Sequence, residues 1–209
     1  DLPLDPFRAL FRAFRRDLSQ TRYQLFEDLL GYCRDSANPV GELVMRLFGE
    51  VPDERMARAS DAVCTGLQLA NHWQDVASDA ARGRLYLPLE DCARFGVDPE
   101  AVLRGEDSEA LRRLLAFETA RTRKLLESGG ALLGQLGGRL RVEVALFRQG
   151  GLAACDALAR AGYAVQQGAP RLRRADRVRV LVRGLRDAAA PPGVRPGAEV
   201  AADPRLRDA

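Results

Sequence analysis

The segment NHWQDVASDAARGRLYLP, residues 71–88, carries the pattern from which the fold and the chemistry of this chain can be approached. Asn71, Asp75 and Asp79 follow one another at intervals of four residues. Such intervals drift by only about 40° per step around an α-helix, so the three side chains line one narrow stripe. Leu67 and Val63 continue that stripe backward along the chain. The sequence therefore predicts a helix whose stripe is apolar in its first half and acidic in its second.

Two explanations account for the acidic half of the stripe. Charged residues on a helix usually form a solvated face. However, Asp75 and Asp79 lie near the predicted end of the helix, where the macrodipole disfavours anions, and like charges four residues apart repel each other. A bound cation would remove both costs, and a set of two carboxylates and one amide carbonyl suits Mg²⁺ better than zinc. Arg82 and Arg84 follow where they could meet a phosphate group beyond the metal.

The composition is that of an ordinary globular domain. The chain has 209 residues, of which 46% are hydrophobic and 29% charged, enough for one domain with a sizeable core. No apolar run approaches the ~20 residues that span a bilayer, and no secretory signal precedes the first predicted helix, so we expect a cytoplasmic protein. The four cysteines form no CxxC pair, which favours reduced thiols over disulfides or a zinc site. The only histidine is His72, which excludes His-based triads and multi-His metal sites.

Helical periodicity dominates the chain, and no convincing alternating strand is present. A long helix is predicted from Asp53 to about Asp79, followed by a short extended segment over residues 83–88. Other helices are expected over residues 5–19, 22–35, 40–48, 89–95, 98–105, 107–128 and 131–166, the last with glycine breaks at 137–138 and 150–151. The sequence predicts an all-α fold with one helical domain over residues 1–187 and a disordered Ala/Pro/Gly-rich tail over residues 188–209.

Seven arginines lie between positions 171 and 186. In helical register Arg173, Arg177 and Arg183 share a loose face, and the opposite face is apolar, made by Val178, Leu181, Val182 and Leu185. This pattern is commonly a surface helix. A peripheral contact with the inner membrane is the second interpretation. No nucleic-acid partner is expected, because aromatic residues do not alternate with the arginines and no known motif is present.

Two segments together resemble the squalene/phytoene synthase family of head-to-head prenyl synthases. LQLANHWQDVASDAARGRLYLP, residues 67–88, is similar to the second aspartate-rich motif of that family, and TRYQLFEDLLGYCRDSANPVGELVMRLFG, residues 21–49, is similar to its Tyr…Tyr-Cys…Val-Gly segment. The resemblance runs from about Asp17 to Arg183. The segments SANPVG and NHWQDV are most similar to those of the bacterial hydroxysqualene synthases of hopanoid biosynthesis. The resemblance implies an isoprenoid-synthase-type helical bundle around a central cavity.

The resemblance also assigns residues to a site. Asp75 and Asp79 match the aspartates of the family's DxxxD, with Asn71 as a further ligand of Mg²⁺. Tyr23 matches a tyrosine that packs near the reacting carbons, so Asp75, Asp79 and Tyr23 are the expected catalytic residues. The residues expected to bind the substrate are Gln68, Gln74, Arg82, Tyr86, Ala37, Val40, Gly41 and Leu67.

Several of these assignments have an ordinary structural alternative. Tyr23 and Tyr86 could be half-buried tyrosines without a chemical role, and the small residues beside Pro39 could merely let two helices approach. Gln74 stands where many members of the family have an arginine. His72 and Trp73 receive no role in the chemistry and are expected in the core.

The chain departs from the family in two respects. The first aspartate-rich motif, which faces the second in the family, is not found, and we expect the chain to begin within the fold without the N-terminal helices. Relatives that condense two prenyl diphosphates often carry a tyrosine near Gly150 and Gly151. A glycine pair there is expected to leave room for water.

The resemblance implies an enzyme that ionises presqualene diphosphate with Mg²⁺ and lets water capture the carbocation, giving hydroxysqualene. The other substrate considered is farnesyl diphosphate. Two alternatives remain open: condensation of two prenyl diphosphates by a squalene or phytoene synthase, and a non-catalytic assembly subunit of the same fold.

Overall fold

The computed structural model describes residues 2–191, and within this range the regular structure is helical. One isolated parallel β-bridge joins Arg22 to Leu85. The helices in chain order are α1 (Asp5–Arg16), α2 (Phe26–Ser36), α3 (Asn38–Leu47), α4 (Glu54–Gln74), α5 (Val76–Ala80), α6 (Leu89–Phe95), α7 (Pro99–Leu103), α8 (Glu109–Ser128), the 3₁₀-helix η1 (Gly129–Gly134), α9 (Gly138–Arg160), the 3₁₀-helix η2 (Val165–Gln167) and α10 (Arg174–Ala189). The all-α prediction is confirmed.

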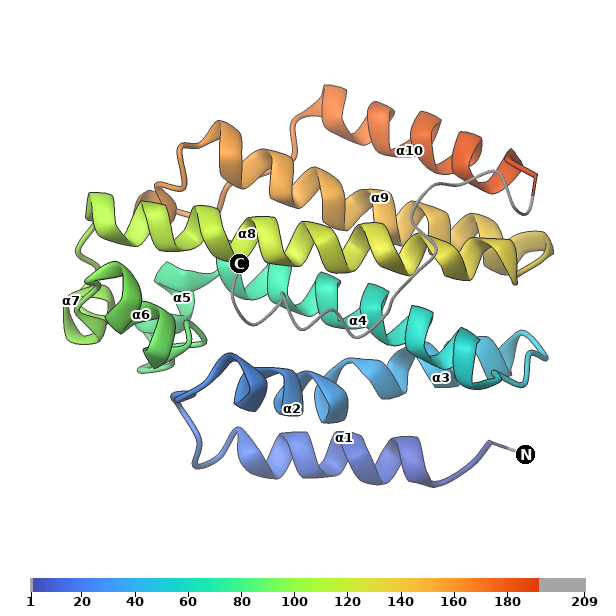
Figure 1. Cartoon of the computed structure of the whole chain (residues 1–209), viewed down its shortest axis with the longest axis horizontal. Helices are drawn as coiled ribbons and strands as arrows, with labels where there is room; N and C mark the ends of the chain where they lie inside the picture. Colours follow the sequence, from blue (N-terminus) through green and yellow to red (C-terminus); the bar gives the residue numbers. More distant parts are fainter. Residues whose placement is uncertain (1, 192–209) are drawn as a thin grey trace.

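Helix α4 is the central element of the bundle. It packs against α8 and α9 on one side and against α2 and α3 on the other. Helix α1 lies against α2 and α3, and α10 lies against α9, so these two helices form opposite edges of the molecule (Figure 1). The short helices α5, α6 and α7 gather at the end of the bundle where α4 finishes (Figure 1).

Local sequence signals explain where several helices begin and end. Asp53 caps α4 by accepting a hydrogen bond from the Met56 backbone N–H at 2.7 Å, and Ser108 caps α8 in the same way through Leu111 at 3.1 Å. Pro39 occupies the first turn of α3, where its missing N–H costs nothing. Gly96 ends α6 in the left-handed conformation, with φ of 70°. These boundaries agree with the sequence-based expectations.

Three boundaries differ from the predictions. The long helix is interrupted at Asp75, whose φ of −97° and ψ of 9° separate α4 from α5. Tyr23 lies before α2, and its carbonyl accepts a hydrogen bond from the Leu89 N–H at 3.0 Å. The helix predicted over residues 22–35 therefore begins later, at Phe26. The expected break at Gly150 and Gly151 is wrong, because α9 continues through both residues.

Two clusters of buried apolar side chains form the core, and the larger surrounds Trp73. The indole N–H of Trp73 donates to the Thr122 hydroxyl at 2.7 Å, which satisfies a buried donor between α4 and α8. His72 is also buried, as expected. Helix α10 continues to Ala189, two residues past the expected end of the helical domain, and the rest of the predicted tail, residues 192–209, lies outside the described residues. None of the described helices is long and apolar enough to cross a membrane.

Candidate active site

The stripe of Asn71, Asp75 and Asp79 keeps its helical register across the junction of α4 and α5. The Asp75 N–H donates to the Asn71 carbonyl at 2.9 Å, and the Asp79 N–H donates to the Asp75 carbonyl at 2.8 Å. Asn71 and Asp75 are exposed, whereas the Asp79 side chain keeps only 15% of its surface accessible. The predicted juxtaposition of the three oxygen-bearing side chains is therefore present, at the end of α4 that faces the short helices.

The electrostatics of this stripe favour a cation. Burial raises the pKa of the Asp79 carboxyl, and the nearby Asp75 charge raises it further, whereas Arg82 and Arg84 lower it. The Arg82 guanidinium is largely exposed and lies 4.0 Å from Asp79 Oδ1, the limit of an ion pair. Among residues 2–191, Asp75 has no ion-pair partner. The two carboxylates therefore sit one turn apart with only partial compensation of their repulsion.

The donor set fits a hard divalent cation that keeps part of its water shell. The described residues contain no group of three or more His, Cys, Asp and Glu side chains that could enclose a metal. Two carboxylates and the Asn71 amide oxygen are, however, the kind and number of protein ligands that Mg²⁺ uses when water and phosphate complete its coordination. Asn71, Asp75 and Asp79 are consequently the residues that could hold such an ion.

A cluster of four aromatic side chains adjoins the stripe. The His72 and Tyr86 rings stack with centroids 3.7 Å apart, and the Tyr23 ring stacks on Tyr86 with centroids 5.7 Å apart. Tyr32 completes the cluster, 5.9 Å from Tyr86 and 5.6 Å from Tyr23. His72 follows Asn71 directly in α4, so the cluster adjoins the start of the acidic stripe. Burial raises the pKa of the Tyr86 hydroxyl, and the charge of Asp79 raises it further. Of these residues, only Tyr23 and Tyr86 were assigned to the site from the sequence.

Burial keeps the ionisable members of the aromatic cluster neutral. It raises the pKa of the Tyr23, Tyr32 and Tyr86 hydroxyls, and it lowers the pKa of His72 to about 3. The imidazole lies within hydrogen-bond distance of the Gln68 amide nitrogen, at 3.2 Å. The cluster therefore presents neutral rings, suited to contact with a positively charged carbon through cation–π attraction.

Asp17 is a polar component that the sequence-based assignment missed. The Tyr32 hydroxyl donates to Asp17 Oδ2 at 3.2 Å, and the Arg84 guanidinium donates to the Asp17 carbonyl at 3.2 Å. Asp17 Oδ1 and the Tyr23 hydroxyl are buried without a protein partner. Buried polar atoms without a hydrogen bond destabilise the fold unless water or a ligand supplies the missing partner. The residue follows α1 directly and belongs to no local motif, so only the fold reveals its position.

The residues expected at the helix break do not share one environment. Ala37 is buried, and Val40 keeps 47% of its surface exposed. Gly41 makes a close approach to α4, because a Cβ there would lie 2.4 Å from Ser60 Oγ and 2.7 Å from Cys64 Sγ. This contact supports the alternative that the small residue lets two helices approach. Contact of Ala37, Val40 and Gly41 with a prenyl chain remains a prediction.

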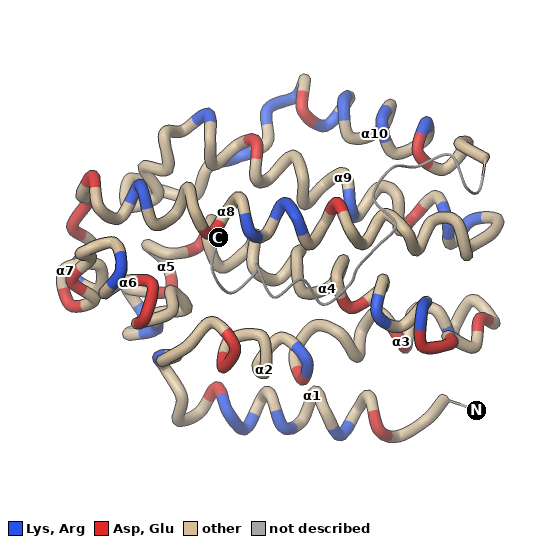
Figure 2. Tube along the Cα trace, in the orientation of Figure 1, with Lys and Arg blue, Asp and Glu red and all other residues tan. Residues whose placement is uncertain are grey.

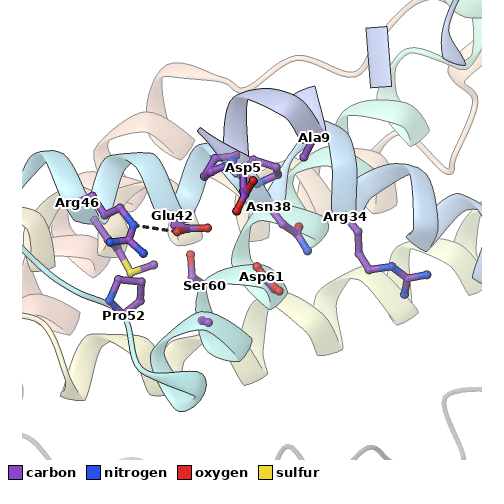
Figure 3. A pocket seen from close by; sticks show the side chains of 13 residues that line it. Asp5, Ala9, Arg34, Asn38, Glu42, Arg46, Pro52, Ser60 and Asp61 are labelled. Atoms are coloured by element: carbon purple, nitrogen blue, oxygen red, sulfur yellow. Dashed lines mark hydrogen bonds and ion pairs between the residues drawn. The ribbon is translucent and has the colours of Figure 1, made fainter. Parts of the chain in front are cut away.

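A cavity of about 430 Å³ lies beside this helix break, between α1, α3 and α4 (Figure 3). Its lining includes Asn38, Glu42 and Asp61, and none of the predicted site residues. Asp61 precedes Asp75 by 14 residues on the same helix, a rise of about 20 Å, so the cavity is well separated from the acidic stripe. Burial raises the pKa of Asp61 to about 6.

Gln74 and Leu67 are occupied by contacts within the bundle. The Gln74 side chain donates to the Pro170 carbonyl at 2.8 Å, which ties the end of α4 to the segment before α10. Leu67 and Leu126 approach Gly151 so closely that a Cβ on this glycine would lie 2.9 Å from each side chain. The expectation that Gly151 leaves room for water is wrong, because these leucine side chains fill the space. At Gly150 a Cβ would meet no atom within 4 Å.

Comparison with known proteins places these residues in a family. The model of the squalene/phytoene synthase family matches residues 1–180. The chain is 36% identical to a hydroxysqualene synthase of Sinorhizobium fredii over 140 residues, which cover 66% of this chain and 47% of that protein. It is also 36% identical to a 15-cis-phytoene synthase of Synechocystis over 137 residues, covering 60% and 41% of the respective chains.

A solved structure agrees with the sequence relationship. The crystal structure of squalene synthase HpnC from Alicyclobacillus acidocaldarius superposes with a TM-score of 0.74 at 43% identity, covering 78% of this chain and 61% of that one. The chain thus spans about half the length of the curated relatives it matches. The bundle described above therefore corresponds to part of the fold of that solved structure.

Proposed function

Because this chain belongs to the squalene/phytoene synthase family, we propose that it acts on a prenyl diphosphate. The reaction proposed is ionisation of presqualene diphosphate followed by capture of the carbocation by water. Diphosphate leaves with the electrons of the carbon–oxygen bond, water adds to the cation, and one proton is released, giving hydroxysqualene without a reductant. The observation that carries the proposal is that the acidic stripe of Asn71, Asp75 and Asp79 adjoins the neutral aromatic cluster through His72, which follows Asn71 and stacks on Tyr86.

The residues divide between the two ends of such a substrate. Asn71, Asp75 and Asp79 would hold Mg²⁺, which supplies Lewis-acid neutralisation of the charge on the departing diphosphate. Arg82 and Arg84 lower the pKa of the nearby Asp79 carboxyl, and their guanidinium groups would contact phosphate oxygens.

The aromatic cluster would serve the carbon end of the substrate. The faces of Tyr23 and Tyr86 can stabilise positive charge, and burial keeps their hydroxyls protonated, so that no phenolate is present to attack the cation. The Gln68 amide lies 3.2 Å from the His72 ring and would contact the substrate from there. The rigid stacking of His72 on Tyr86 fixes the orientation of these groups before a substrate binds.

The test is an assay of the longest natural polypeptide that contains these residues. Presqualene diphosphate and Mg²⁺ are supplied without reductant, and the products are identified by mass spectrometry. Hydroxysqualene is the expected product. Asp75→Asn is expected to reduce its rate of formation at least about 100-fold, because one of two carboxylate ligands is lost. Glu109→Gln is the matched control, since it neutralises an exposed carboxylate at the start of α8 and should leave the rate unchanged.

Parallel reactions distinguish the alternatives within the family. Farnesyl or geranylgeranyl diphosphate is supplied with and without NADPH. A squalene or phytoene product, with no turnover of presqualene diphosphate to hydroxysqualene, would replace the proposed reaction by condensation of two prenyl diphosphates. Failure to turn over any of the three substrates would contradict catalysis altogether and favour the assembly-subunit alternative.

A further inference from the structure

Helix α10 has the reverse of the polarity expected of a helix on a protein surface. Its buried residues are Asp176 and Gly184, which face α9. The side turned away from α9 is apolar, with exposed fractions of 62% for Val178, 50% for Leu181, 59% for Val182 and 48% for Leu185. These four residues follow the i, i+3, i+4, i+7 spacing of one helix face. A helix usually buries such a face and exposes its acids, so the outward stripe of α10 needs an apolar partner.

The inward side of α10 is held to the bundle by polar contacts. Asp176 accepts from the Arg160 guanidinium at 2.6 Å, and Asp187 accepts from the Gln149 amide at 2.7 Å. Gly184 permits close packing, because a Cβ there would lie 2.6 Å from a Leu146 methyl carbon. Asp176 and Asp187 are the two acidic residues of α10. Since both bond to groups on α9, the outward side of the helix carries no acidic residue.

Arginines border the apolar stripe on both sides. Helical spacing puts Arg177 along one border and Arg179 and Arg186 along the other, with Arg174 at the start of the stripe itself. Arg183 lies on the side toward α9, near Asp156 and Asp176. Within residues 2–191, Arg179 pairs with Asp176 at 3.5 Å, whereas Arg174, Arg177 and Arg186 make no ion pair. Figure 2 shows these basic residues along the outer edge of the molecule.

We propose that α10 docks the protein on the surface of an anionic lipid bilayer. The four apolar side chains would enter the boundary between headgroups and acyl chains, and the bordering arginines would reach lipid phosphates. The charge pattern favours this partner over two others. A second copy of the chain would bring like-charged borders together, and a nucleic acid would leave the central apolar stripe uncovered.

The position of α10 connects this surface to the candidate active site. The hydrogen bond from Gln74 to the Pro170 carbonyl joins the segment that leads into α10 to the end of α4, one residue before Asp75. The inference depends on the exposed face of α10 alone and does not require the proposed catalytic function.

The test is co-sedimentation of the full chain with vesicles of phosphatidylcholine, with and without about one-third phosphatidylglycerol. We expect binding to the anionic vesicles that is at least tenfold stronger than binding to the neutral ones. Leu181→Asp combined with Leu185→Asp should weaken the binding at least about 100-fold, because charge replaces the centre of the inserted stripe. Arg177→Ser combined with Arg186→Ser should weaken it about 25-fold, at about fivefold for each arginine.

A matched variant separates this surface from general hydrophobicity. Leu47 and Val51 lie away from α10 with exposed fractions of 69% and 77%, and Leu47→Asp combined with Val51→Asp should leave binding unchanged. Urea unfolding followed by the fluorescence of the single tryptophan, Trp73, verifies that each variant is folded. Equal loss of binding in the control variant, or no preference for anionic vesicles, would overturn the proposal. So would a dimer in light scattering that dissociates in the Leu181→Asp and Leu185→Asp variant without any vesicle binding.

Discussion

Arg121 lies in a buried charge cluster between α6 and α8, and its replacement gives a sharp test of the energetics of this bundle. Its guanidinium is 3.2 Å from Asp91 Oδ2 and 3.5 Å from Glu118 Oε1, and all three residues are buried. It also lies over the Phe26 ring at 3.9 Å and the Phe117 ring at 4.5 Å. Arg121→Met keeps much of the apolar volume but leaves two buried carboxyl groups without their cation. We expect a loss of about 3–5 kcal/mol in the free energy of unfolding.

The free energy of unfolding should depend on pH through the ionisation of Glu118. Burial raises the pKa of Glu118 well above its usual range, and Arg121 lowers it. A carboxyl with a raised folded pKa contributes stability that is present at low pH and is lost as the pH rises through that pKa. The penalty of Arg121→Met should therefore be larger at pH 8 than at pH 5. Glu118→Gln should cost less than about 1 kcal/mol at pH 8, because the amide keeps hydrogen-bonding groups and removes a buried charge.

Urea unfolding measured by Trp73 fluorescence is the appropriate assay, because this tryptophan is fully buried in the core. Arg123→Met is the matched control: it lies two residues further along α8 and pairs with Asp156 while about one-third exposed. A partly exposed pair of this kind should contribute no more than about 1 kcal/mol. Equal losses for Arg121→Met and Arg123→Met would refute the reasoning, as would a loss for Glu118→Gln equal to that for Arg121→Met.

Three further changes test other parts of the bundle. Asp61→Asn should raise stability by about 1–3 kcal/mol at pH 8 and much less at pH 4. Burial raises the Asp61 pKa to about 6, so the cost of its charge grows as the pH rises from about 4, the ordinary pKa, to about 6. A gain equal at both pH values would contradict this. Gly151→Leu should lower the unfolding free energy by about 1–3 kcal/mol, because the larger side chain would overpack against Leu67 and Leu126. Gly150→Ala in the same helix should raise it by up to about 1 kcal/mol. The opposite order of stabilities would disprove the close contact at Gly151. Thr122→Val should cost about 1–3 kcal/mol in urea unfolding, because the buried Trp73 N–H loses its 2.7 Å acceptor, and an unchanged midpoint would show that the bond contributes nothing.

The positions of the helices were largely predictable because their signals are local. Asp53 and Ser108 cap the helices that follow them, Pro39 opens α3, and Gly96 closes α6. Each signal acts within about one helical turn, so no knowledge of distant residues is needed. The acidic stripe was predictable for the same reason, because steps of four residues stay on one side of a helix whatever the rest of the chain does.

Glycine illustrates where such local inference fails. Gly150 and Gly151 were interpreted as a break, but α9 passes through them and Gly151 serves close packing against Leu67 and Leu126. A glycine in a helix lowers its stability by about 1 kcal/mol whether it breaks the helix or allows a neighbour to approach. Only the position of the neighbouring helix tells the two uses apart.

The sequence by itself determined the all-α class, the order of the helices and the placement of Asn71, Asp75 and Asp79 on one stripe. The tertiary structure decided which groups from distant segments stand beside that stripe: it brought Tyr23, Tyr32 and Tyr86 together and set Asp17 against them. It also decided which side of α10 faces outward. The physical reason is that helical periodicity and caps are encoded within a few neighbouring residues, whereas side-chain contacts depend on how separate helices pack and on which faces that packing leaves uncovered.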